Sequence, residues 1–136
     1  MLANILRIRV LVFKNIINFP RCPNLTKVNI PCNVTQIGKD SFSGCNITSI
    51  EIPEGVTTIP QGAFDYCANL SNVKIPKSVT TIEDNAFEFC ASLKTVTIPN
   101  KKVKIGDYAF GKDTKVYIED SNNEKNLYQR PAVTTN

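Results

Sequence analysis

The 136-residue chain contains no histidine, no tryptophan and only one methionine. Histidine is the usual general base near neutral pH and the commonest metal ligand, so its absence excludes histidine-dependent triads and most metal sites. The sequence also lacks a phosphate-binding loop, a dinucleotide-binding glycine motif and a G-x-S-x-G motif. The acidic residues fall at predicted turns without a recurring inward pair. The sequence therefore predicts a protein that is not an enzyme and has no cofactor.

A strong charge of one sign is also missing. The chain has 16 Lys and Arg against 12 Asp and Glu, which leaves a formal charge of +4 spread along its length. Nucleic-acid-binding proteins gather basic residues into a patch or stripe, and no such stripe interleaved with aromatic residues is present. We expect no nucleic-acid partner.

Long apolar runs are absent as well. No apolar stretch reaches the length of about 18 residues that a membrane-spanning helix needs, so we expect no membrane span. The N-terminal segment MLANILRIRVLVFKNII allows two interpretations, a secretory signal peptide and a degenerate first repeat. Arg7, Arg9 and Lys14 divide the apolar run into pieces too short for a signal peptide, and no small-residue cleavage site follows. We favour the degenerate repeat.

Five cysteines are present, but their spacing does not indicate a disulfide framework. Cys22, Cys45, Cys67 and Cys90 recur at an almost constant interval, and no C-x-x-C pair occurs. Regular spacing favours one recurring position of a repeat, filled by a small buried apolar side chain. Disulfide or metal chemistry is the alternative. Cys32 falls outside this series and is interpreted as an ordinary turn residue.

An internal repeat is the main feature of the sequence. Ile-Pro pairs recur at Ile30, Ile52, Ile75 and Ile98, and phenylalanines recur with the same period at Phe19, Phe42, Phe64, Phe87 and Phe110. This period falls within the range of about 20–29 residues that is typical of leucine-rich repeat solenoids.

The repeat unit reads L-x-x-V-x-I-P-x-x-V-x-x-I-x-x-x-A-F-x-x-C-x-x. The V-x-I step alternates with period two and predicts a short half-buried strand, which the following proline ends because it cannot donate a ladder hydrogen bond. The second apolar pair predicts a short extended segment, and A-F-x-x-C predicts a helical turn. One repeat cannot bury these side chains alone, so successive repeats must stack, with like residues on like.

Three phrases carry a family resemblance: LTKVNIPCNVTQIGKDSFSGC, ITSIEIPEGVTTIPQGAFDYC and LSNVKIPKSVTTIEDNAFEFC. They closely resemble the BspA-like leucine-rich repeats of the Treponema pallidum type, over about residues 18 to 118. The resemblance implies a mainly β, curved leucine-rich repeat solenoid, with one short strand per repeat, a second short extended segment and helical turns. Such repeats occur in surface proteins of mucosal bacteria and protist parasites.

Some relatives of this kind are adhesins that bind host matrix or cell-surface proteins. The resemblance therefore implies a non-catalytic protein-binding module with a cell-surface or secreted location, and we expect a monomer. An intracellular scaffold for protein–protein interaction is the alternative, because no clear signal peptide is present and a cytoplasmic location stays open. A structural spacer without a ligand is a third possibility.

The repeat boundaries divide the chain into three parts. We expect a degenerate N-terminal repeat or cap over residues 1–24, the solenoid over 25–118 and a flexible polar tail over 119–136. Terminal repeats are usually atypical because they expose one face to water. Lys102 and Asp113 occupy the valine and cysteine positions of the last repeat.

Residues that alternate with the buried V-x-I pair must point outward from the strands. They vary between repeats while the inward positions do not, as expected of a binding surface on a constant scaffold. A solvated face with no partner is the alternative. The predicted binding row is Asn29, Glu51, Lys74, Thr97 and Tyr117, and the flanking row is Lys27, Ser49, Asn72, Thr95 and Lys115.

Glycosylation sequons occur at four asparagines, and three of them share one repeat position. Duplication of the repeat explains these three sequons nearly as well as selection for glycosylation does. Glycosylation would matter only if the chain is secreted. The four are Asn24, Asn33, Asn46 and Asn69.

Overall fold

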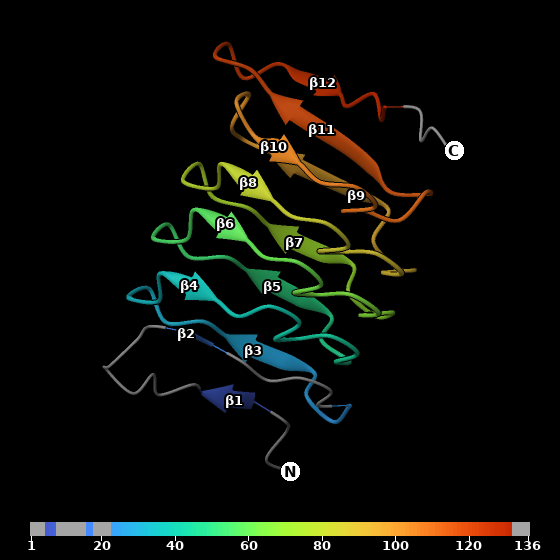
Figure 1. The fold of residues 1–136 in the computed structure, drawn as a ribbon. Coiled ribbons are helices and arrows are strands. Elements are labelled where there is room, and N and C mark those ends of the chain that lie inside the picture. The colour runs from blue at the N-terminus through green and yellow to red at the C-terminus, as the bar shows by residue number, and fades with distance from the viewer. Residues whose placement is uncertain (1–4, 8–15, 18–22, 132–136) are drawn as a thin grey trace.

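The computed structural model describes residues 5–7, 16–17 and 23–131 (Figure 1). Most of the expected N-terminal part, residues 1–24, lies outside the described residues, and so does Cys22. Every regular element in the described part is a short β-strand. The strands are β1 (Ile5–Arg7), β2 (Ile16–Ile17), β3 (Lys27–Asn29), β4 (Gln36–Ile37), β5 (Ser49–Glu51), β6 (Thr58–Ile59), β7 (Asn72–Lys74), β8 (Thr81–Ile82), β9 (Thr95–Ile98), β10 (Lys104–Ile105), β11 (Lys115–Glu119) and β12 (Lys125–Leu127).

The strands stack as a continuous series of rungs, each rung being one repeat (Figure 1). From β1 to β10 the first strand of each rung is odd-numbered and the second is even-numbered, and β11 is a further first strand. First strands pair in parallel in β1–β3, β5–β7 and β9–β11, for example with Ile50 of β5 beside Val73 of β7. Second strands pair in the same way, with Ile59 of β6 beside Ile82 of β8. The predicted mainly β leucine-rich repeat solenoid is confirmed.

The third side of each rung is a loop that contains the A-F-x-x-C segment or, in the first and last loops, a variant of it with Ser41 or Asp113. We call these four loops, residues 38–45, 60–67, 83–90 and 106–113, the loop edge. The predicted helical turn is here a series of tight turns, with Cys67 N donating to Phe64 O at 3.3 Å. No helix forms in the described residues. In the first three loops the reason is that alternate N–H groups bond to the next rung and so cannot build a helical ladder, as Phe64 N does to Ala86 O at 2.8 Å.

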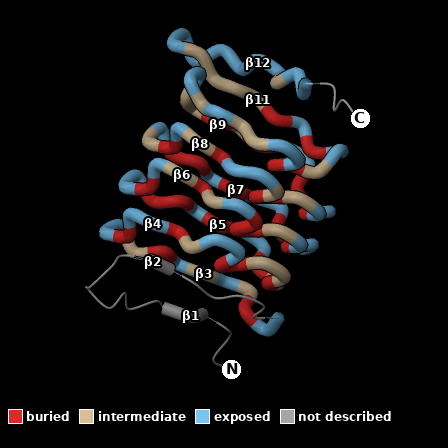
Figure 2. The backbone as a smooth tube through the Cα atoms, in the orientation of Figure 1, coloured by how far each residue is buried: buried red, intermediate tan, exposed pale blue. Residues whose placement is uncertain are grey.

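The core is made of repeating apolar side chains, and buried positions recur from rung to rung (Figure 2). Phe42, Phe64, Phe87 and Phe110 form a continuous stack, with ring centroids 5.1 to 5.2 Å apart and planes within 6° of parallel. Cys45, Cys67 and Cys90 are buried, and Cys32 is exposed. The predicted ladders of like residues are therefore present.

Residues 119–131 differ from the predicted flexible tail. β11 continues to Glu119, and β12 pairs with it in antiparallel fashion. The intervening turn is held by Asp120, whose Oδ1 accepts from Asn122 N at 2.8 Å and from Glu124 N at 3.0 Å. Tyr128 then packs against the core. The polar composition concealed this strand because an edge strand is held by its backbone and needs no apolar alternation.

Candidate protein-binding face

The first strands present one continuous outer surface, which we call the strand face. In β5 and β7 the central residue is buried and its two neighbours are exposed, because successive side chains of a strand point to opposite sides. Both predicted rows therefore lie on the same outer surface. Asn29, Glu51 and Lys74 are exposed, whereas Thr97 and Tyr117 are half-buried.

Register brings the predicted residues together in pairs. Glu51 and Lys74 are direct partners across β5 and β7, and Thr97 and Tyr117 are direct partners across β9 and β11. The Lys74 Nζ donates to Glu51 Oε1 at 2.9 Å, and this hydrogen bond, together with the charge of Glu51, raises the pKa of Lys74. Both side chains are more than 70% exposed. Such exposed pairs add little to stability, so the pair chiefly places two opposite charges on the strand face.

Two shallow hollows mark the strand face. One, of about 580 Å³, lies over β5, β7 and β9 and includes Glu51, Lys74 and Thr97. The other, of about 670 Å³, lies over the Ile-Pro turns and includes Asn29, Glu51 and Lys74. Tyr117 lines neither hollow. Glu119 lines both, and the sequence did not predict it because this residue was assigned to the tail.

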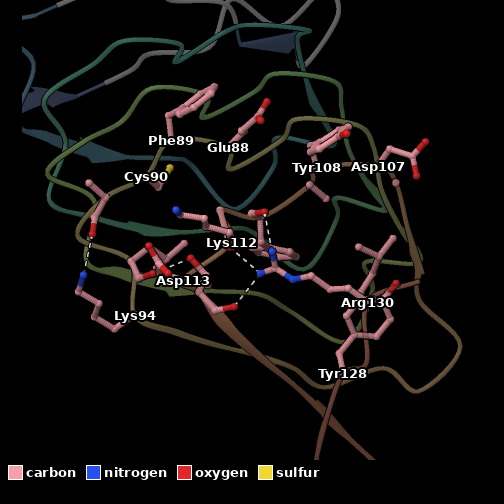
Figure 3. A pocket seen from close by; sticks show the side chains of 18 of the residues that line it. Glu88, Phe89, Cys90, Lys94, Asp107, Tyr108, Lys112, Asp113, Tyr128 and Arg130 are labelled. Atoms are coloured by element: carbon pink, nitrogen blue, oxygen red, sulfur yellow. Dashed lines mark hydrogen bonds between the residues drawn. The ribbon is translucent and has the colours of Figure 1, made fainter. Parts of the chain in front are cut away.

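A third and more enclosed hollow, of about 750 Å³, lies at the C-terminal end of the stack (Figure 3). Leu93, Ala109 and Phe110 contribute to its apolar lining, and Tyr128 and Arg130 close it from the C-terminal segment. The Arg130 guanidinium donates to the carbonyl oxygens of Phe110 at 3.4 Å and Thr114 at 2.7 Å. The last repeat is contracted and has Asp113 in the cysteine position, and its departure from the regular loop leaves this space. The contraction and the replacement of cysteine are visible in the sequence, whereas the hollow is not.

The buried thiols are not suited to nucleophilic chemistry. Burial is the main cause that raises the pKa of Cys67 far above its ordinary value and that of Cys90 to about 12. The Cys67 and Cys90 thiols donate to the carbonyl oxygens of Phe42 at 3.0 Å and Phe64 at 3.1 Å. Among the described residues no group of three or more His, Cys, Asp or Glu could hold a metal ion. Nor does the described part contain a helix that could cross a membrane.

Two of the sequon asparagines take part in contacts between rungs. Asn46 Nδ2 donates to Pro23 O at 2.6 Å, and Asn69 Nδ2 donates to Asn46 Oδ1 at 3.4 Å. Their shared repeat position therefore has a structural use. Asn24 and Asn33 are exposed.

Comparison with known proteins agrees with the repeat and the fold. The family described as the BspA type leucine-rich repeat region matches residues 13–128 in six copies, a longer span than the sequence motifs indicated. No curated protein matches the chain.

Solved leucine-rich repeat proteins from bacteria have the same fold. One from Bacteroides ovatus is 33% identical, with a TM-score of 0.70 over 79% of this chain and 29% of its own length. One from Bacteroides capillosus is 29% identical, with a TM-score of 0.58 over 81% and 80%. A leucine-rich cell surface protein from Faecalibacterium prausnitzii is 24% identical, with a TM-score of 0.52 over 82% and 41%, and shows the fold alone. The chain belongs to the family of proteins with BspA-type leucine-rich repeats.

Proposed function

We propose that the chain is a protein-binding module whose strand face contacts the partner. Leucine-rich repeat proteins are generally non-enzymatic binding scaffolds, and membership of this family supports the interaction role. The observation that carries the proposal is the contrast between the two sides of the first strands. The inner side repeats Ile50, Val73 and Val96, while the outer side changes from rung to rung.

The strand face offers charge recognition at its centre. Glu51 and Lys74 are fixed side by side, with exposed polar residues around them. Paired opposite charges select a partner by complementarity and by repulsion of the wrong charge. The binding row is Asn29, Glu51, Lys74, Thr97 and Tyr117.

The finer proposal is that the partner is a host matrix or cell-surface protein, as for adhesins with similar repeats. An intracellular scaffold is the competing proposal. Exposure of the protein on intact cells, measured with antibody or protease, separates the two, since only a surface protein is reached from outside.

The test is a binding screen of the purified full chain against immobilised matrix proteins and host-cell surfaces. For any partner found, Lys74→Glu should weaken binding while the protein still folds and unfolds cooperatively on heating. Lys39→Glu is the matched control, because Lys39 is an exposed lysine on the loop edge and not on the strand face. Equal affinity of the wild type and the Lys74 variant would remove the strand face from the proposal.

A further inference from the structure

Three aromatic side chains project into solvent from the loop edge. Tyr66, Phe89 and Tyr108 are 57%, 53% and 55% exposed, respectively, and they are three of the four most exposed large apolar side chains in the described residues. Stacking of the loops brings Tyr66 beside Phe89, since Tyr66 N donates to Glu88 O at 2.9 Å. Phe89 and Tyr108 both line the hollow at the C-terminal end of the stack. The edge formed by these loops runs along the stack in Figure 1.

Two of these rings form an ordered surface pair. The rings of Tyr66 and Phe89 stack with centroids 4.6 Å apart and planes 19° from parallel. Each residue nevertheless remains more than half exposed. The pair therefore presents preorganised aromatic surface to a partner.

The backbone under all three rings is strained. Tyr66, Phe89 and Tyr108 have φ of 58°, 54° and 55°, a left-handed conformation that bulky L-residues rarely adopt. The position of Tyr66 and Phe89 is filled in the preceding rung by Gly44, with φ 70°, and glycine adopts this conformation without strain. Aromatic residues at these positions therefore lower the stability of the fold through backbone strain, and burial does not compensate because their side chains are exposed. Strain of this kind clusters at sites that contact ligands.

Carboxylates accompany the rings. Asp65, Glu88 and Asp107 immediately precede the three aromatic residues, and Figure 3 shows Glu88 and Asp107 close to Phe89 and Tyr108. The four loops together contain seven carboxylates and two lysines, whereas the whole chain is basic. The seven are Asp40, Asp65, Glu83, Asp84, Glu88, Asp107 and Asp113.

We propose that the loop edge binds a basic, extended segment of a protein partner through Tyr66, Phe89 and Tyr108 and the adjoining carboxylates. A Lys or Arg cation is attracted to the face of an aromatic ring and forms charge-assisted hydrogen bonds with carboxylates. Charge complementarity favours a cationic occupant over a neutral or acidic one. This surface shares no residue with the strand face, so the two can be tested separately.

The experiment measures fluorescence anisotropy of a labelled eight-residue peptide of alternating Arg and Gly, titrated with the full chain at low salt. The control peptide replaces each Arg by citrulline, which keeps the shape and removes the charge. The Arg peptide should bind more tightly than the citrulline peptide, and its affinity should fall when salt is raised to about 150 mM. Equal binding of the two peptides, or no binding of the Arg peptide, would overturn the proposal.

Variants of the loop edge identify the surface. The double variant Tyr66→Gly and Phe89→Gly suits the left-handed backbone, so it should fold, and it should bind the Arg peptide about fivefold to thirtyfold more weakly, from two cation–π contacts. The double variant Glu88→Gln and Asp107→Asn should also bind more weakly. The control for the aromatic variant is Leu127→Ser, which removes an exposed apolar side chain outside the loop edge. The control for the carboxylate variant is the double variant Glu54→Gln and Glu124→Gln, which removes two negative charges outside the loop edge. Unchanged affinity of both loop-edge variants would overturn the proposal, and loss of binding in Glu51→Gln would assign the peptide to the strand face instead.

Discussion

The rings of Phe64 and Phe87 stack with their centroids 5.1 Å apart and their planes 6° from parallel. The two residues occupy the same position of consecutive repeats, so the contact joins two successive rungs. Both side chains are fully buried. The stability of a repeat protein depends largely on interfaces between neighbours, and this stack is the most extensive aromatic part of the interface.

Phe87→Ala should lower the free energy of unfolding by about 3–5 kcal/mol, because the ring is fully buried and contacts a phenylalanine on each side. Urea denaturation followed by circular dichroism measures this change. The control is Phe89→Ala, which removes a ring that is 53% exposed and should change stability by less than about 1 kcal/mol. Equal effects of the two variants would contradict a stabilising role of the stack.

The sequence predicts this stack because buried positions repeat. Ile-Pro, V-x-x-I and A-F recur in register, and a parallel stack of identical rungs has one arrangement that places like residues on like. The same reasoning places Glu51 and Lys74 in one outward row. Repetition is thus sufficient to predict the rungs, the core and the composition of the strand face.

The features that the sequence did not predict are those that do not repeat. β12 is polar and is positioned by backbone pairing with β11, while Arg130 is held by carbonyl oxygens of the last loop. The exposed Tyr66 and Phe89 were concealed because an aromatic residue usually indicates a core position. The signal that could have revealed them is Gly44, which occupies the same position one rung earlier and marks a left-handed backbone.

Gly106→Ala should destabilise the fold because two rungs approach closely at this residue. A methyl group there would lie 2.6 Å from the backbone nitrogen of Asp84 and 2.8 Å from the carbonyl carbon of Glu83. Backbone atoms cannot move aside as a flexible side chain can, so we expect a loss of about 1–3 kcal/mol. Thermal unfolding measures it. Gly111→Ala is the control, since its nearest neighbour would be Thr114 Oγ1 at 3.7 Å, and a loss as large in this variant would refute the steric explanation.

Among Cys32, Cys45, Cys67 and Cys90, only Cys32 should react rapidly with iodoacetamide at pH 8. The other three are buried, and burial raises the pKa of Cys90 to about 12, so almost no thiolate is present at that pH. Mass spectrometry of peptides from native and urea-unfolded protein measures the modification of each residue. Rapid labelling of Cys67 or Cys90 in the native protein would show that the stack opens locally.

Asp65 is a half-buried carboxylic acid on the loop edge. Its Oδ1 is buried and has no hydrogen-bond partner among the described residues. Burial raises the pKa of Asp65 from 3.8 to about 6, the charges of Glu88 and Asp40 contribute to the rise, and a hydrogen bond from the backbone N–H of Tyr66 opposes it. The folded protein therefore binds a proton more tightly here than the unfolded chain does.

Stability should consequently increase as the pH falls from 7 towards 4, and this contribution should be lost as the pH rises through about 6. Asp65→Asn should remove the dependence and stabilise the protein at pH 7.5 by about 1 kcal/mol, a gain limited by solvent screening. Urea denaturation at pH 4.5, 6 and 7.5 measures both effects. The control is Asp113→Asn, which changes the net charge equally on an exposed side chain and should leave the slope between pH 4.5 and 7.5 as in the wild type. If Asp65→Asn and the wild type show the same slope, the pH dependence belongs to other carboxylates of the loop edge.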